Sequence, residues 1–170
     1  MRAFALLVAI GCTVPACETT LIDPAVDYGD EPPYVPEGEP HLELGYYTEQ
    51  LYAPLEEGDA CYVIFGLQGG TWTMPALRAS GVLADLVVQC SLTTDAGEPL
   101  GATDEPQRFY LAPDGLIEVQ AFPVPVTHAP PREADPIDDL FGQRATLECR
   151  VVDTEGREAT ASVDCVLEQH

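Results

Sequence analysis

Six cysteines carry the most distinctive chemistry of this 170-residue sequence. The four from residue 61 onward lie far apart, without the close C-x-x-C pairs of structural zinc sites, so a metal site is disfavoured. Each of them falls on the apolar phase of a segment that alternates like a β-strand. Because cysteines in an exported protein form disulfides, we predict two bridges among Cys61, Cys90, Cys149 and Cys165.

Four cysteines allow three disulfide connectivities. A tight turn at residues 155–156 would place Cys149 opposite Ser162 in the last hairpin, which disfavours a bond between Cys149 and Cys165. Two arrangements remain open: Cys61–Cys165 with Cys90–Cys149, which we favour, and Cys61–Cys149 with Cys90–Cys165. In either arrangement, each bond would stabilise the fold by about 2–4 kcal/mol.

Few side chains suit general acid–base or nucleophilic catalysis. The three histidines are His41, His128 and His170, and we expect all of them to be solvated surface residues. No serine stands in a G-x-S-x-G elbow, and Met74 lacks the Cys–His–Met loop of a copper site. We therefore expect a protein that is not an enzyme and needs no cofactor, with an unrecognised hydrolase as an alternative.

A run of carboxylates near residue 135 could bind Ca²⁺, since hard oxygen ligands in a loop suit that ion. Its weak candidate ligands are Asp135, Asp138 and Asp139. Their spacing matches no EF-hand, and aspartate-rich turns are commonly solvated. We predict a solvated loop without a metal, and a Ca²⁺-binding envelope protein stays as an alternative.

The most unusual loop contains two adjacent glycines and the only tryptophan. We assign a candidate recognition loop to Gln68, Gly69, Gly70, Trp72 and Arg78. Glycine permits close backbone approach, and an exposed Trp can anchor a glycan or a protein. In the other interpretation Trp72 is the buried aromatic residue of the core and the two glycines form a bend.

The charge of the chain excludes several classes of partner. Seven arginines, no lysine and 29 acids give a formal net charge of −22. Such a protein is repelled by nucleic-acid phosphates and by anionic lipid headgroups. Apolar residues make up 46% of the chain, which suffices for one core, so we expect one domain and a tail.

The N-terminal segment has the form of an export signal. Residues 3–11 form an unbroken apolar run after Met1 and Arg2. A bilayer span needs about 20 residues, so this run is a signal h-region and not a transmembrane helix. We assign residues 1–16 to a signal peptide.

An apolar stretch that ends in a small residue and a cysteine resembles the bacterial lipobox, and Gly11-Cys12 and Ala16-Cys17 both have this form. The resemblance implies cleavage before the cysteine and acylation of its sulfur. We favour Cys17, because it leaves a signal of ordinary length and an even number of cysteines, with Cys12 as the alternative. The resemblance implies a lipid-anchored envelope protein, on the outer membrane or the periplasmic face, whose acyl chains lie in the bilayer. A soluble secreted protein that begins at Cys17 is the other possibility.

Residues 17–41 are predicted to form an acidic, proline-rich tether. The stretch 18–59 holds 12 acids, six prolines and no basic residue. Like charges repel and Pro favours an extended chain, so this composition suits a spacer. The same stretch contains five tyrosines that could mark a partner-binding segment, although two of them also suit a first strand: Tyr28, Tyr34, Tyr46, Tyr47 and Tyr52.

From residue 42 to residue 170 the pattern is typical of an all-β domain. Short segments rich in β-branched and aromatic residues alternate with turn residues, and helical patterns of ten residues are absent. The expected strands cover residues 61–67, 85–92, 108–111, 116–122, 145–152 and 160–167. We predict an antiparallel sandwich of six to eight short strands, with hairpin turns at residues 112–115 and 153–156.

This pattern resembles the immunoglobulin-like sandwich domains of bacterial surface proteins. Trp72 follows Cys61 at a distance of 11 residues, and the hairpin over residues 145–167 is similar to the last two strands of such modules. The tyrosine corner is missing, since Leu147 stands two residues before Cys149. The resemblance covers roughly residues 42–168 and implies a non-catalytic interaction module with a protein or glycan ligand.

Overall fold

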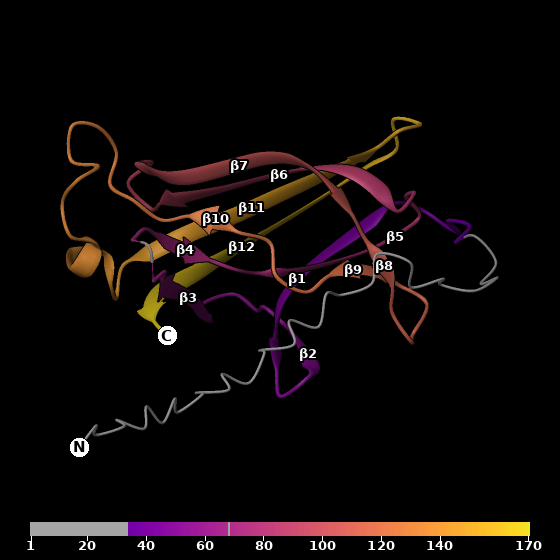
Figure 1. Cartoon of the computed structure of the whole chain (residues 1–170), viewed down its shortest axis with the longest axis horizontal. Helices are drawn as coiled ribbons and strands as arrows, with labels where there is room; N and C mark the ends of the chain where they lie inside the picture. The colour runs from indigo at the N-terminus through magenta and orange to yellow at the C-terminus, as the bar shows by residue number, and fades with distance from the viewer. Residues whose placement is uncertain (1–33, 68) are drawn as a thin grey trace, which may run out of the picture. The chain divides into compact units, whose positions relative to one another are not determined.

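The computed structural model describes residues 34–67 and 69–170. The signal peptide, both candidate lipidation sites, Gln68 and the tether up to residue 33 lie outside the described residues. The predicted all-β fold is confirmed, because the described residues form two mostly antiparallel sheets and a single 3₁₀ turn, η1 (Ile137–Leu140) (Figure 1). No helix in this part of the chain is long and apolar enough to cross a membrane.

The five-stranded sheet has the order β2-β1-β5-β9-β8 and the seven-stranded sheet the order β10-β4-β3-β12-β11-β6-β7. The first sheet contains β1 (His41–Thr48), β2 (Leu51–Pro54), β5 (Ala76–Ser80), β8 (Tyr110–Leu111) and β9 (Ile117–Val119). The second contains β3 (Ala60–Phe65), β4 (Thr71–Thr73), β6 (Asp85–Thr94), β7 (Pro99–Arg108), β10 (Val124–Pro125), β11 (Arg144–Asp153) and β12 (Glu158–Gln169). Only the β3–β12 pair is parallel among these described strands.

The central strands β6, β11 and β12 alternate between buried and exposed side chains. Leu86, Val88 and Leu92 of β6 are buried, as are Leu147 and Val151 of β11, and they belong to one core with residues of both sheets. This is the phase predicted from the sequence, and it follows from the two-residue period of a strand with one face toward the core.

The last hairpin is confirmed, but its register differs by one residue from the expected one. Cys149 lies opposite Ala161 and not opposite Ser162. The reason is the length of the turn, since Asp153 and Arg157 close the hairpin through a backbone hydrogen bond of 3.0 Å and leave three residues between them. Gly156, at φ +81°, supplies the left-handed position that such a loop requires.

Both disulfides have the favoured connectivity. Cys90 and Cys149 face each other in the β6–β11 register, with their Cα atoms 4.1 Å apart. Cys61 of β3 bonds to Cys165 of the parallel neighbour β12, with a Cα–Cα distance of 5.6 Å. Both bonds therefore lie within the seven-stranded sheet, whereas the disulfide of antibody domains joins the two sheets.

The two edge strands of the seven-stranded sheet, β10 and β7, are linked by backbone hydrogen bonds. The amide of Val126 donates to the carbonyl oxygen of Thr71 in β4, and the amide of Thr127 donates to that of Leu100 in β7, at 2.9 and 2.8 Å. Gly101 permits this approach, because a Cβ there would collide with the Pro125 carbonyl oxygen. Part of the edge of β7 is thereby covered, and an uncovered strand edge is a site of aggregation.

The described residues form twelve strands, and those that the sequence does not indicate are short or poor in β-forming residues. β7 contains two prolines and two acids, yet it extends over ten residues because it pairs with β6 along its length. Proline and charge are tolerated there since β7 is the last strand of its sheet. β5 is rich in alanine and is held between β1 and β9.

Asp153, at the end of β11, is a buried carboxylate that fixes two loops. Its Oδ1 accepts hydrogen bonds from the backbone amides of Glu155 and Arg157, and its Oδ2 accepts from the Leu83 amide and from Arg157 Nε, all at 2.9 Å. Burial opposes ionisation, but the three amides and the Arg157 charge outweigh it and hold the pKa of Asp153 below its ordinary value of 3.8.

We expect Asp153→Asn to lower the free energy of unfolding at pH 7 by about 2 kcal/mol, because the buried acceptor of charge-assisted bonds is weakened. Because the folded pKa is depressed, the contribution of this carboxylate is full above pH 3.8 and is lost as the pH falls through the folded pKa. Urea unfolding between pH 2 and 7 should show a shallower acid limb for the variant. Asp104→Asn, which changes an exposed carboxylate on β7, is the control. Equal acid limbs for the wild type and Asp153→Asn would contradict this role.

We expect alkylation of the denatured, unreduced domain to modify none of the four paired cysteines, and reduction to release four thiols. Reduction should also lower the melting temperature strongly, since two bonds of about 2–4 kcal/mol each are comparable with the total stability of a small domain. Mass spectrometry and calorimetry measure these effects. Free thiols before reduction, or an unchanged melting temperature after it, would remove the disulfide framework.

Candidate functional site

The predicted recognition loop does not form a single group of side chains. Trp72 lies in β4 and is half-buried, whereas Arg78 is buried in β5 of the other sheet. Gly70, at φ +94°, lies beneath the Trp72 ring, where a Cβ would come within 2.6 Å of it. Trp72 is thus neither a fully buried core residue nor a freely exposed anchor, and the grouping with Arg78 is corrected.

Arg78 instead forms the centre of a polar cluster on the five-stranded sheet. Its Nε lies 3.2 Å from Glu118, which is opposite Arg78 on the neighbouring strand β9. Its guanidinium also donates a hydrogen bond to Asp114. The Tyr52 ring stacks on the guanidinium at 4.5 Å. Gly45 makes room for that ring, because a Cβ there would lie 2.6 Å from it.

The cluster carries more negative than positive charge, because Arg78 is paired with both Asp114 and Glu118. Burial, and then the hydrogen bond that its hydroxyl donates to Glu118, raise the pKa of Tyr47 to about 12. Burial also raises the pKa of Tyr52, with a further contribution from the Glu43 charge. The hydrogen bond from Arg78 holds the pKa of Asp114 below its ordinary value. Arg78 therefore balances one of its two carboxylate partners, and its contacts join Tyr52, Asp114 and Glu118 to β5.

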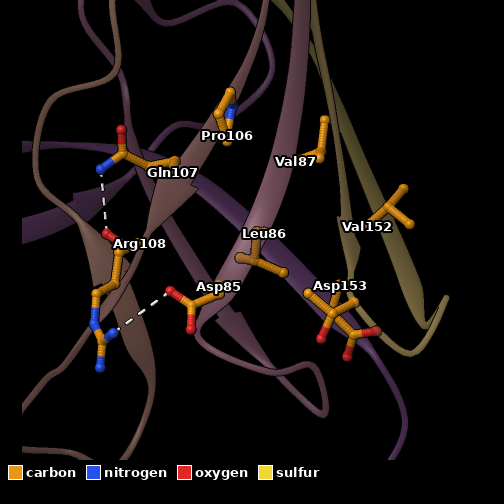
Figure 2. A pocket seen from close by; sticks show the side chains of 9 residues that line it. Asp85, Leu86, Val87, Pro106, Gln107, Arg108, Val152 and Asp153 are labelled. Atoms are coloured by element: carbon orange, nitrogen blue, oxygen red, sulfur yellow. Dashed lines mark hydrogen bonds and ion pairs between the residues drawn. The ribbon is translucent and has the colours of Figure 1, made fainter.

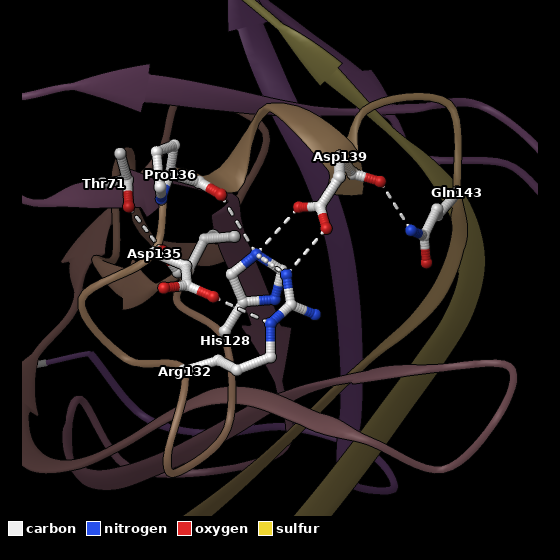
Figure 3. Close-up of polar contacts among 8 residues, drawn as sticks. Thr71, His128, Arg132, Asp135, Pro136, Asp139 and Gln143 are labelled. Carbon is white, nitrogen blue, oxygen red and sulfur yellow. Dashed lines mark hydrogen bonds and ion pairs between the residues drawn. The ribbon is translucent and has the colours of Figure 1, made fainter.

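A second polar cluster surrounds His128 (Figure 3). The expectation that His128 is solvated is wrong: its side chain is buried, because η1 folds the proline-rich loop back and buries Ile137 and Leu140 in the core. Its Nε2 lies 2.8 Å from Asp139 Oδ1 and 3.1 Å from the Pro136 carbonyl oxygen. The Arg132 guanidinium lies farther from the same nitrogen, at 3.5 Å. Because the two nearer groups are acceptors, Nε2 is assigned as the nitrogen that donates.

The same cluster engages two of the three candidate Ca²⁺ ligands. Arg132 lies 2.9 Å from Asp135 and 2.8 Å from Asp139, and its hydrogen bond is the main reason why the pKa of Asp139 lies below its ordinary value (Figure 3). Asp138 is exposed and takes no part in these contacts. Within the described ranges, no group of three or more His, Cys, Asp and Glu side chains is arranged to hold a metal ion.

A recess of about 350 Å³ lies on the outer face of the seven-stranded sheet (Figure 2). Pro106, Val87 and Val152 form one row across β7, β6 and β11, and the exposed pair of Arg108 and Asp85, 3.6 Å apart, lies beside them. The recess is open, and its polar side chains are engaged within the chain: Arg108 pairs with Asp85, Gln107 bonds to the Arg108 carbonyl, and Asp153 bonds to the two loops that it fixes. It therefore does not have the free converging polar groups of a small-molecule site.

The third feature is a pair of adjoining hollows around Tyr46 and Tyr62, which we call the tyrosine hollow. The hollows measure about 250 and 310 Å³ and share Tyr46, Thr48 and Tyr62. The rings of Tyr46 and Tyr62 meet edge to face with centroids 5.6 Å apart.

The Tyr46 hydroxyl is fixed by a 2.7 Å hydrogen bond with Thr73, and Tyr62 is 41% exposed. Asp59 lines one hollow, and Ile64, Met74 and His170 line the other.

Only part of this arrangement is predictable from the sequence. The tyrosines of the acidic segment stand out there, whereas for Tyr62 the sequence indicates only a position in a strand. Tyr46 and Tyr62 lie in different sheets, so their contact depends on how the sheets pack. A signal was present in the alternation of β3, which places Tyr62 on the opposite phase from Cys61 and Val63 and thus away from the core.

No protein-family model matches the chain, and no curated protein sequence matches it.

We expect Arg78→Leu to lower the free energy of unfolding by about 3 kcal/mol, because it leaves the buried Glu118 carboxylate without its partner. The double variant Arg78→Leu/Glu118→Leu should recover most of the loss, since apolar groups can replace a buried ion pair at little cost. Arg108→Leu, which breaks the exposed pair with Asp85, should cost less than about 1 kcal/mol. Urea unfolding measures all three, and similar losses for Arg78→Leu and Arg108→Leu would refute the central role of Arg78.

Proposed function

We propose that this chain is an exported, lipid-anchored protein of the cell envelope whose β-sandwich is a non-catalytic interaction module. The observation that carries the proposal is the pair of buried disulfides, Cys61–Cys165 and Cys90–Cys149. Such bonds form and persist in oxidising compartments outside the cytosol. They agree with the export signal expected over residues 1–16.

The lipid anchor is supported by the arithmetic of the cysteines. All four cysteines of the domain form disulfides with one another, so none of them is left to pair with a further thiol. Acylation at Cys17 removes Cys12 with the signal and leaves no free thiol, whereas acylation at Cys12 leaves Cys17 unpaired. The acidic, proline-rich residues that follow would act as the spacer between the membrane and the domain.

The non-catalytic character is supported by the contacts of His128. A general base that activates a nucleophile lies within hydrogen-bond reach of a hydroxyl or thiol. The partners of His128 are instead a carboxylate, a guanidinium and a backbone carbonyl, which form a structural ion-pair cluster. Asp135 and Asp139 bind Arg132, which speaks against the Ca²⁺ alternative as well.

Metabolic labelling with a fatty acid in a bacterial host tests the anchor. We expect the wild type and Cys12→Ser to be labelled and Cys17→Ser to lose the label, because the thiol of Cys17 is the proposed acceptor. Loss of label in Cys12→Ser alone would move the anchor to Cys12, and alkylation should then find a free thiol at Cys17. Label that persists in both variants and in the double variant would refute the anchor in both forms.

A further inference from the structure

The tyrosine hollow lies in a part of the surface with uncompensated negative charge. Residues 34–170 contain 24 of the 29 acids and only six arginines. Five of these arginines form ion pairs with carboxylates of the same chain. The domain therefore offers a surplus of carboxylates to any partner, and few free cations.

Two of these surplus carboxylates lie beside Tyr62, and two more precede them in the chain. Glu168 of β12 lies next to Tyr62 in the β3–β12 register, and Asp59 lines the hollow itself. Glu56 and Glu57 precede Asp59, with the Glu56 amide donating to the Asp59 carboxylate. None of these four carboxylates forms an ion pair with a basic side chain of the described residues. The nearest arginine in the sheet register, Arg144, lies opposite Val166 on the far side of β12 from β3.

We propose that the tyrosine hollow binds a basic segment of a partner protein, through a Lys or Arg side chain placed against the tyrosine rings. A cation gains free energy over an aromatic face, and Tyr46 is held in place by its bond to Thr73. Asp59 and Glu168 would attract the charge, while Ile64 and Met74 would contact the aliphatic stem. This inference rests on the proposed function, since it specifies the ligand of the interaction module.

The chemistry of the hollow favours a cation over other ligands of an aromatic surface. A neutral sugar could also stack on Tyr62, but it would leave the surrounding carboxylates unmatched. An acidic ligand would be repelled by the same groups. A basic peptide satisfies both the rings and the charges, and its attraction should weaken as salt screens it.

The test uses the mature chain and a fluorescent octapeptide of alternating Lys and Gly, with binding measured by anisotropy at low and physiological salt. We expect the peptide to bind, binding to weaken at the higher salt, and an Nε-acetylated peptide not to bind. Tyr62→Leu should weaken binding about fivefold, since it keeps apolar area but removes the aromatic face. Tyr110→Leu, which changes an exposed tyrosine on β8, is the matched control and should change binding less than twofold.

Charge variants provide a second measurement that does not require a substitution of Tyr62. Asp59→Asn should weaken binding about threefold, whereas Glu105→Gln on β7 should leave it unchanged. Equal losses in the Tyr62 and Tyr110 variants would show diffuse attraction and overturn the site. Competition by an N-acetylglucosamine tetrasaccharide, or no binding of the peptide, would overturn the assigned ligand. Fatty-acid labelling is independent of these results, so the anchor can stand while this inference fails.

Discussion

Two disulfides fix the register of the four strands at the centre of the seven-stranded sheet. Cys90 and Cys149 face each other across β6 and β11, and Cys61 and Cys165 join β3 to β12. Because strand side chains alternate between faces, a slip of one residue would turn these cysteines and their apolar neighbours toward solvent. The bonds and the buried face therefore enforce the same register, and the remaining strands are added around it.

The shortage of basic residues determines how the charged side chains are arranged. The described arginines are largely matched by carboxylates of the same chain, and two of them organise clusters where polar groups are buried: Arg78 beneath Tyr52, and Arg132 beside His128. Since almost every cation is used internally, the outer surface is left strongly acidic. Negative charge of this kind disfavours contact with nucleic-acid phosphates and anionic lipids, and it agrees with the proposal of a basic partner.

The proposed anchor, tether and sandwich form a consistent physical scheme. Two disulfides within one sheet stabilise a domain in an oxidising compartment, where such bonds persist. An acidic, proline-rich tether would keep the domain away from an anionic membrane surface, because like charges repel.

The sequence by itself determined the features that depend on local pattern. Alternation in β6, β11 and β12 predicted their inward faces, the turn residues predicted the two hairpins, and an oxidising context predicted the disulfides. Only the tertiary structure decided what depends on neighbours distant in the chain. β7 is a strand because β6 pairs with it, and His128 is buried because η1 covers it. Tyr46 meets Tyr62 because two sheets pack. Each of these contacts joins segments whose local sequence contains no information about the other segment. A local sequence pattern therefore cannot predict them.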